Sequence, residues 1–404
     1  MFLISVKVQT SIHLDEPIKI TLTGHNKTKI ESLKQELENQ MKLFLTASSH
    51  KGGGRCVFDA HVADSACVDV IHRMVARTRV VLSCLKVYAQ YGNIIVAACA
   101  SLCTDYVDTT TDIDWVGERR IKYSSTASAS GCRIISLCGF GDVPSDLAIL
   151  AAVETLKGES GNGIEIEKGF TWHANTGMAT WANLKMLYES TIKARNYLGR
   201  SISFHMDDPL LLAHPKVRGD TKLLILRNKS VWREWLNRFS MNHTFLRGSP
   251  FTMATVNTEV VHTSTASLKY GPNFSHRESY LPVGFRGTAK LPILPCISTF
   301  LVHLAILFDV IVLKMPLLGS LLIFILEKLV SDETRASGQV RVYAEVRDTL
   351  GKNGKADIAN ALLKFKGDPL NGIKAQCVSE AALVLLLDNA DLPERSEDGF
   401  GTPA

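Results

Sequence analysis

The sequence lacks the features that mark several classes of protein. Lys and Arg number 45 against 40 Asp and Glu, a small excess, and no stretch interleaves basic with aromatic residues as nucleic-acid binding requires. The nine cysteines form no CxxC pair and have no histidine at metal-ligand spacing. These absences argue against a nucleic-acid partner and against a metal site.

A secretion signal is missing as well. The opening residues, MFLISVKVQTSIHLDEP, hold only a short apolar run interrupted by Lys7, and no small-residue cleavage site follows. We therefore expect a cytosol-facing protein that is not secreted and keeps its cysteines reduced. The N-x-S/T sequons are interpreted as chance matches; they lie at Asn26, Asn228, Asn242 and Asn273.

The composition is that of a globular chain. Its 404 residues are 46% hydrophobic and 21% charged, which excludes a disordered or collagen-like protein and allows two to three domains. The mean hydropathy of +0.08 is positive for a chain that otherwise resembles a water-soluble enzyme. A locally very apolar segment must raise it.

Residues 1–160 alternate between short β-branched runs and segments of helical periodicity. The predicted strands are Ile18–Thr23, Val57–His61, Arg79–Cys84, Asp105–Thr109 and Arg133–Cys138. The predicted helices are Lys27–Met41, Asp64–Ala76, Tyr88–Cys103, Asp112–Ser130 and Pro144–Lys157. Short connections between them imply right-handed crossovers and a doubly wound parallel α/β sheet. Ligands of such sheets bind beyond the carboxyl ends of the strands.

Residues 161–404 are predicted to form a second, α+β domain for substrate or dimer contacts. Its expected strands are Ile164–Trp172 and Gln339–Val346, and its expected helices are Thr176–Ala194 and Ile373–Asp388. The polar stretch Lys216–Phe245 is interpreted as a surface helical excursion.

The segment 291–330 explains the mean hydropathy. It is strongly apolar but is interrupted by His303, Asp309, Lys314, Pro316 and Gly319, whereas a spanning helix needs about 20 uninterrupted apolar residues. Two shorter apolar helices lying in a lipid interface fit these interruptions. The alternative is a pair of helices buried against the second domain or at a homodimer contact.

A glycine-rich phosphate-binding turn is not found where a dinucleotide-binding fold needs one. The first strand-helix unit, IKITLTGHNKTKIESLKQEL, contains the single glycine Gly24. The run Lys51–Arg55 is rich in glycine but follows a helix and precedes a strand, which predicts a flexible connection.

Several motifs together resemble the saccharopine dehydrogenase-like oxidoreductases, a family that includes trans-acting enoyl reductases and eukaryotic lipid-droplet members. The motifs are RTRVVLSCLKVYAQYGNIIVAACASLCTDYVDTTTDIDWV, GCRIISLCGFGDVPSDLAIL, Thr176–Thr180, SPFTMATVNTEVVHTSTASLKYGPNFSHRESYLPVGF and the closing GFGTPA. They occur in the family's order and cover about residues 18–404. The resemblance implies a Rossmann-like NAD(P)-binding domain, and the apolar segment resembles that of the eukaryotic branch.

The chain departs from the family pattern at the cofactor. The family's first strand and Gly-rich turn are replaced by the opening residues quoted above, so the domain is predicted to be incomplete at its N-terminal side. Its Gly-Arg is Gly24-His25 here, with Lys27 nearby, and its Gly-Pro-Tyr is Lys86–Tyr88. Because no carboxylate ends this strand, NADP is favoured over NAD. The chain also stops at Ala404, where the family continues into a further helix.

The resemblance and the strand ends give the candidate site residues. Cofactor contacts are expected from Gly24, His25, Lys27, Ser83, Tyr88, Thr109, Thr110 and Gly139; catalytic roles are expected from Asp142, Asp146, Tyr88 and His173. The aspartates, the threonines, Tyr88 and His173 also have structural alternatives. The two aspartates would cap the helix that they open, the threonines would serve turn chemistry, Tyr88 would pack at a domain interface, and His173 would be a structural histidine near the start of a helix.

The predicted function is an NADP-dependent oxidoreductase that reduces an apolar or lipid-type substrate, linked to glycolipid and lipid metabolism. It is expected at a membrane or lipid-droplet surface through 291–330. The alternative is a catalytically degenerate lipid-surface or scaffold protein that keeps the fold without binding cofactor. A third interpretation is an incomplete gene model that lacks both ends of the protein.

Overall fold

The computed structural model describes most of the first 176 residues and parts of the rest. The described residues are 2–7, 18–47, 56–85, 87–160, 164–176, 212, 249–250, 253–271, 274–281, 338–348, 356–368, 372–387, 392 and 396–404. They fall into two compact units: Met1–Gly139 with Ala375–Pro403, and Phe140–Lys374 with Ala404. The sequence instead predicted a boundary at residue 160, so helix 143–160 lies in a different unit from the one expected.

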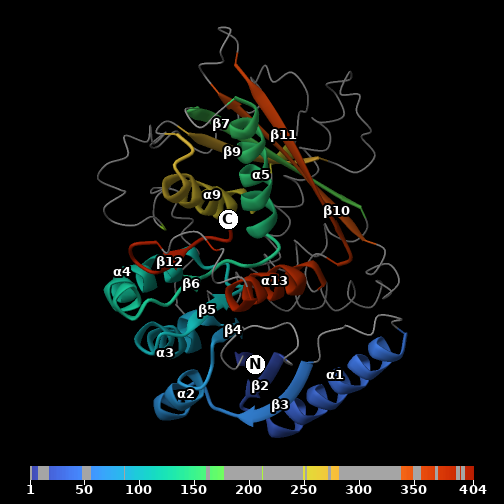
Figure 1. Ribbon diagram of the computed structural model, residues 1–404, viewed down its shortest axis with the longest axis vertical. Helices are drawn as coiled ribbons and strands as arrows, with labels where there is room; N and C mark the ends of the chain where they lie inside the picture. Colours follow the sequence, from blue (N-terminus) through green and yellow to red (C-terminus); the bar gives the residue numbers. More distant parts are fainter. Residues whose placement is uncertain are drawn as a thin grey trace, which may run out of the picture. The chain divides into compact units, whose positions relative to one another are not determined.

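Unit 1 contains a seven-stranded sheet in the order β12-β6-β5-β4-β1-β2-β3 (Figure 1). The strands are β1 Phe2–Lys7, β2 Ile18–Gly24, β3 Cys56–Val62, β4 Val80–Cys84, β5 Asp105–Asp108, β6 Ile134–Ile135 and β12 Phe400–Gly401. The helices are α1 Lys27–Ala47, α2 Val68–Val75, α3 Tyr88–Ser101, α4 Ile113–Ser130 and α13 Lys374–Leu387. The predicted α/β class is confirmed.

The strands of unit 1 are parallel except for one. β2 pairs with β3 and β4 with β5 in parallel, and β6 pairs in parallel with both β5 and β12. β1 lies between β2 and β4 and is antiparallel to both, with Leu3 opposite Thr23 on one side and Ser83 on the other. The central position of the sheet is therefore filled by a strand that runs against its neighbours.

The buried strands of unit 1 are apolar because helices cover the sheet. Val80, Val81, Tyr106 and Val107 have no exposed surface, as expected for strands that are buried on both faces. Exposed large hydrophobic side chains include Leu43 on α1 and Val57 and Val62 on the edge strand β3.

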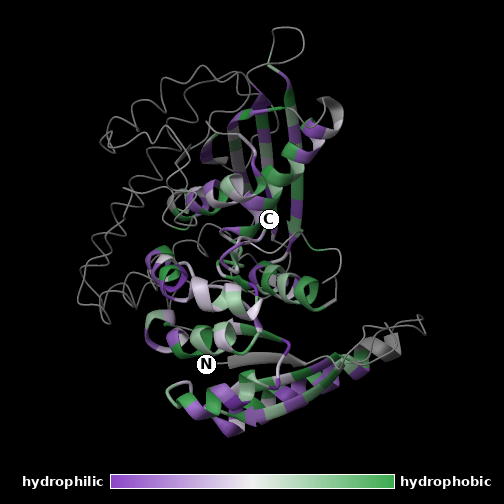
Figure 2. Ribbon diagram, turned by 60° about the vertical axis from the view of Figure 1, so that its left-hand side comes forward, coloured by the Kyte–Doolittle hydropathy of each residue, from purple (hydrophilic) through white to green (hydrophobic). Residues whose placement is uncertain are grey.

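Unit 2 is built on a five-stranded mixed sheet in the order β11-β10-β7-β9-β8. Its elements are α5 Val143–Ser160, β7 Ile166–Thr176, β8 Ser249–Pro250, α9 Ala254–Leu268, β9 Ser275–Leu281, β10 Gln339–Asp348 and β11 Ile358–Lys366. Hydrophobic and hydrophilic residues alternate along its strands (Figure 2), as in a sheet with one buried face. The predicted α+β character of the second domain is confirmed.

One face of the sheet in unit 2 is divided into an apolar and a polar half. Alternate residues of β10 are fully or almost fully buried, namely Val340, Val342, Ala344 and Val346, and α5 packs on β10 and β11. The residues opposite them on β7 include Thr171 and His173, which are buried as well. Polar groups in this position must find hydrogen-bond partners inside the protein.

Several predicted segments lie outside the described residues. They are 51–55, 177–194, 216–245 and the apolar segment 291–330. Among the described helices, none combines the length and apolar character that a membrane crossing requires. Thr176, predicted to open a helix, is the last residue of β7, and His173 lies within this strand rather than near a helix start.

The segment 398–400, near the end of the chain, is held in unit 1 by a buried ion pair. Arg120 Nε on α4 donates to Asp398 Oδ2 at 2.5 Å, and a second nitrogen of Arg120 donates to the carbonyl of Phe400 at 3.3 Å. Both charged side chains are more than nine-tenths buried. Gly399 has φ +73°, and a Cβ there would lie 2.8 Å from that of Ala127, so only glycine fits this turn.

We predict that Asp398→Ala lowers the free energy of unfolding by about 3–5 kcal/mol, because it leaves the Arg120 charge buried without its partner. The measurement is the denaturant midpoint of the full chain. Glu118→Gln is the control: it removes the pair with Arg119, whose acidic side chain is 69% exposed, and should change stability by less than about 1 kcal/mol. Equal midpoint shifts in the two variants would contradict the prediction.

Candidate functional site

The carboxyl ends of the parallel strands in unit 1 carry the residues predicted to contact a cofactor. β2 ends at the buried Gly24, and exposed His25 and Lys27 follow. The amino group of Lys27 lies 3.8 Å from a carboxylate oxygen of Glu31. Asn26 is the N-cap of α1, since its side-chain oxygen accepts from the backbone N–H of Lys29 at 3.0 Å. This turn therefore presents two cationic or titratable side chains to solvent at the edge where ligands of such folds bind.

Tyr88 opens α3, as predicted, but its hydroxyl is bound within the protein. It donates to the carbonyl oxygen of Ser83 at 2.7 Å and accepts from the backbone N–H groups of Leu85 and Thr109, both at 3.3 Å. Burial raises the pKa of Tyr88 well above its ordinary value. These contacts join the ends of β4 and β5 and favour the structural interpretation of this residue.

Asp108, the last residue of β5, is a buried carboxylate at the same edge. Its side chain accepts from the backbone N–H groups of Thr110 and Leu137, at 3.0 and 3.1 Å, and from the hydroxyl of Ser136 at 3.0 Å. Burial raises its pKa to about 6, against the effect of these hydrogen bonds. Leu137 has φ +64°, an uncommon conformation for a residue with a side chain. The Asp108 carboxylate thus holds the turn after β6 in place.

The site residues predicted around the start of α5 lie in unit 2, which begins at Phe140. Gly139 is the exception: it is buried and is the last residue of the segment Met1–Gly139 of unit 1. Asp142, Ser145 and Asp146 have no exposed surface. Asp146 Oδ2 accepts from the Ser264 hydroxyl at 2.9 Å and from the backbone N–H of Ala404 at 3.0 Å. Burial raises the pKa of Asp146 to about 7. No cap contact from Ser145 or Asp146 to the α5 amides is found among the described residues; both side chains bond other elements instead.

A second polar cluster in unit 2 forms around Glu278 on β9. His173 Nε2 lies 2.5 Å from Glu278 Oε1 and 3.0 Å from Ser145 Oγ, and the Ser145 hydroxyl donates to the same Oε1. Thr171 Oγ1 donates to Oε1 at 3.2 Å. The cluster therefore joins α5, β7 and β9 through one carboxylate oxygen.

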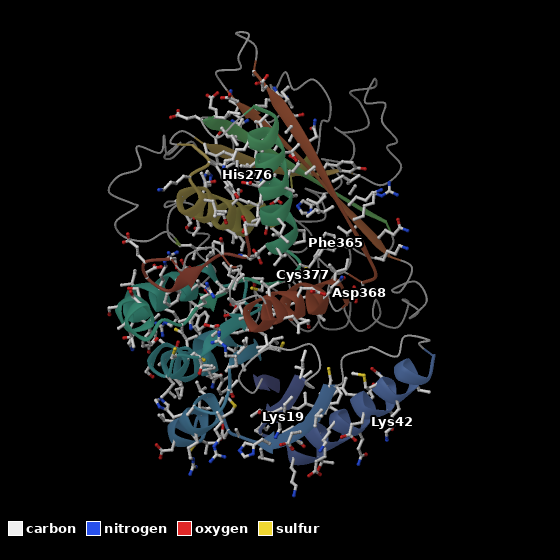
Figure 3. All side chains as sticks on the ribbon, viewed as in Figure 1. Lys19, Lys42, His276, Phe365, Asp368 and Cys377 are labelled. Carbon is white, nitrogen blue, oxygen red and sulfur yellow. The ribbon has the colours of Figure 1, made fainter. Side chains whose placement is uncertain are left out.

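Two further side chains extend the Glu278 cluster. His276, labelled in Figure 3, places Nε2 2.9 Å from Thr171 Oγ1. Asn257 on α9 donates from Nδ2 to Ser145 Oγ at 3.4 Å. All six side chains, those of Ser145, Thr171, His173, Asn257, His276 and Glu278, are buried. Within the described residues, no group of three His, Cys, Asp or Glu side chains is placed to hold a metal ion.

The electrostatics of the cluster favour an ionised Glu278. Burial alone would raise its pKa, but the neighbouring His173 and His276 and the Ser145 hydroxyl lower it below the ordinary value. Burial lowers the pKa of His276 to about 4, although Glu278 acts in the opposite direction. The buried Glu278 carboxylate is thus linked through the Thr171 hydroxyl to the neutral imidazole of His276, a setting able to hold or move protons.

Sequence reasoning selected His173 for this site but missed the residues that surround it. Thr171 and His173 are two positions apart on β7, and His276 and Glu278 are two positions apart on the parallel strand β9, with Thr171 opposite Glu278. Alternate residues of a strand share a face. This two-residue spacing of polar groups in otherwise buried strands was the signal available in the sequence.

The nicotinamide dinucleotide that the sequence resemblance implies needs a glycine-rich turn between a central parallel strand and a helix. In unit 1 the central strand β1 is antiparallel, so its carboxyl end at Lys7 lies at the opposite edge from Gly24 and Cys84. Gly24, His25 and Lys27 fit an anionic phosphate, but the described residues form no turn for the pyrophosphate. The described part of unit 1 therefore accounts for a phosphate contact at the turn after β2, and the other contacts of a dinucleotide would fall on residues outside the described ranges.

Comparison with known proteins supports the expected similarity to enoyl reductases. A trans-acting enoyl reductase of Mycobacterium tuberculosis is 28% identical over 226 residues, 54% of this chain and 51% of that protein. One of Mycobacterium leprae is 40% identical over 88 residues, 22% of this chain and 21% of that protein. The chain thus matches about half the length of the first of these relatives. No protein-family model matches it.

A search of solved structures found the apo saccharopine dehydrogenase (L-Glu forming) of Saccharomyces cerevisiae. It is 10% identical, with a TM-score of 0.41, over 95% of this chain and 88% of that protein. The fold class of the chain is established by its own strand order and pairing.

We predict that the buried Asp146 makes stability fall as the pH rises. Because its folded pKa of about 7 lies above the 3.8 of an ordinary aspartate, the folded state binds the proton more tightly, and stability is lost between about pH 4 and 7. The limit is about 4 kcal/mol, at about 1.36 kcal/mol per pKa unit. Asp146→Asn, which resembles the protonated acid, should lose less stability over this range.

Denaturant unfolding of the full chain at several pH values measures this difference. The control is Asp59→Asn, at an exposed position of β3, and it should keep the pH dependence of the wild type. Parallel stability curves for the wild type and Asp146→Asn would contradict the prediction.

Proposed function

We propose that the chain is an oxidoreductase of the saccharopine dehydrogenase-like type that reduces an apolar, lipid-type substrate in glycolipid or lipid metabolism. The observation that carries the proposal is the 28% identity to a trans-acting enoyl reductase over 226 residues. The strand order of unit 1 and the motifs that follow its strands add support. A nicotinamide cofactor, when bound, supplies the hydride for such a reduction.

NADP is proposed as the cofactor rather than NAD. The turn after β2 holds exposed His25 and Lys27 and no carboxylate that would accept the ribose hydroxyls of NAD. Positive charge beside this turn favours a 2′-phosphate.

We predict measurable binding of NADPH to the full chain, followed by cofactor fluorescence or calorimetry. His25→Arg should tighten it about threefold to tenfold, because a guanidinium is always charged and pairs with a phosphate through two parallel N–H groups. Gln40→Arg adds the same charge at an exposed position of α1 and should leave the affinity unchanged. Folded protein without detectable affinity at millimolar NADPH would refute the proposed enzyme.

A second candidate function is a catalytically degenerate protein that works at a lipid surface. The observation that favours it is the antiparallel β1, which fills the place of the strand that precedes the phosphate turn. In this proposal the chain keeps the fold, and the apolar segment 291–330 recruits it to a membrane or lipid droplet on the cytosolic side. A second copy of the chain is the partner proposed for contacts of the second domain.

We predict that deleting 291–330 abolishes flotation of the protein with phospholipid-coated oil droplets, because this strongly apolar stretch of the sequence is the segment proposed to insert into the lipid surface. Asp142→Asn should float like the wild type. Circular dichroism of the deletion variant checks that both units remain folded. Unchanged flotation after the deletion would reject recruitment through this segment.

A further inference from the structure

The hydrogen-bond donors around Glu278 all contact the same one of its two carboxylate oxygens. Oε1 of Glu278 receives contacts from Ser145, Thr171 and His173. Oε2 has no partner in the described part of the chain, although the residue is 3% exposed. An ionised carboxylate normally has both oxygens hydrogen-bonded when it is buried.

The proton positions around Thr171 fix the tautomer of His276. Thr171 has one hydroxyl proton, and its contact with Glu278 at 3.2 Å requires that proton because the carboxylate is an acceptor. His276 Nε2, 2.9 Å from Thr171 Oγ1, must therefore be the donor of its own contact. A neutral imidazole carries one proton, so Nδ1 is an acceptor, and it also has no partner in the described part.

Asn257 supplies a third unmatched acceptor. Its Nδ2 donates to Ser145 Oγ at 3.4 Å, while Oδ1 is buried without a partner among the described residues. The backbone at Gly141 passes close to this oxygen: a Cβ there would lie 3.4 Å from Oδ1 and 3.1 Å from Met253 Cε. Glycine at 141 therefore lets the backbone pass close to the side chains of Asn257 and Met253.

The three unmatched atoms are of the same kind. Glu278 Oε2, His276 Nδ1 and Asn257 Oδ1 are all acceptors, and they belong to side chains joined by hydrogen bonds to one another through Ser145 and Thr171. Buried acceptors without a donor are costly, and native proteins rarely leave them so.

We propose that this cluster is a binding site for the hydrogen-bond-donating head of a small molecule, an amine or a hydroxyl. A primary ammonium group offers three donors and no acceptor, and a hydroxyl offers one donor. The charge of Glu278 favours the ammonium, and the neutral His276 adds no repulsion. The site lies within unit 2 and needs no nicotinamide cofactor, so it goes beyond the proposed function and can be tested separately.

The test compares three probes that share a four-carbon tail. Thermal unfolding of the full chain is followed in n-butylammonium chloride, n-butanol and sodium butyrate at equal ionic strength and pH 7.5, without cofactor. A saturable rise in Tm with the amine or the alcohol, and none with butyrate, is the expected result. Which of the two probes acts identifies the charge of the natural head group.

Two variants assign the effect to the cluster. Glu278→Gln should weaken the apparent affinity for the active probe at least about tenfold, because it replaces a charged acceptor. Asn257→Leu should weaken it as well by removing a neutral acceptor. Glu118→Gln, at an exposed position of unit 1, is the matched control and should respond like the wild type.

A spectroscopic measurement keeps the test decisive if either variant fails to fold. In wild-type protein with labelled histidine, the ring signals of His276, assigned with His276→Gln, should shift with the probe concentration. Absence of a saturable Tm rise and of this shift would overturn the proposal, as would an equal effect of butyrate. Unchanged affinity in folded Glu278→Gln would overturn it too, and ordered water would then be the only occupant.

Discussion

Glu278 imposes the main constraint on unit 2, because a buried carboxylate must be hydrogen-bonded or it would be too costly to bury. Its Oε1 brings the first turn of α5 together with β7 and β9. The polar side chains of Thr171 and His173 on this face of the sheet hydrogen-bond to this oxygen, whereas the fully or almost fully buried residues of β10 are apolar and contribute packing alone. Chemistry and stability in this unit therefore depend on the same side chain.

Unit 1 uses a buried carboxylate in a different way. Asp108 receives two backbone N–H groups and one hydroxyl, so its role is to fix loops at the carboxyl edge of the sheet. Tyr88 does the same with a neutral hydroxyl. The predicted cofactor edge is thus held rigidly by groups that have little hydrogen-bonding capacity left for a ligand, while the turn after β2 remains exposed.

Sequence reasoning located most elements of unit 1 to within a few residues, since short β-branched runs such as 80–84 alternate with amphipathic helices. It could not foresee that β1 runs antiparallel, because strand direction depends on long-range pairing. It found Asp146 and His173 but missed Glu278, which meets Thr171 across 107 positions of the chain. The two-residue spacing of polar groups on each strand indicates a shared face, but which residues meet is decided by the register of the two parallel strands.

The direction of β1 also affects how the sheet of unit 1 holds together. In the described part of the sheet, the block of β2 and β3 is joined to the block of β4, β5, β6 and β12 through the six residues Phe2–Lys7. If these residues leave the sheet, two strand edges with unpaired N–H and C=O groups are exposed at once. Such edges pair readily with other chains, so β1 protects the sheet of unit 1 against edge-to-edge association as well as joining its two blocks.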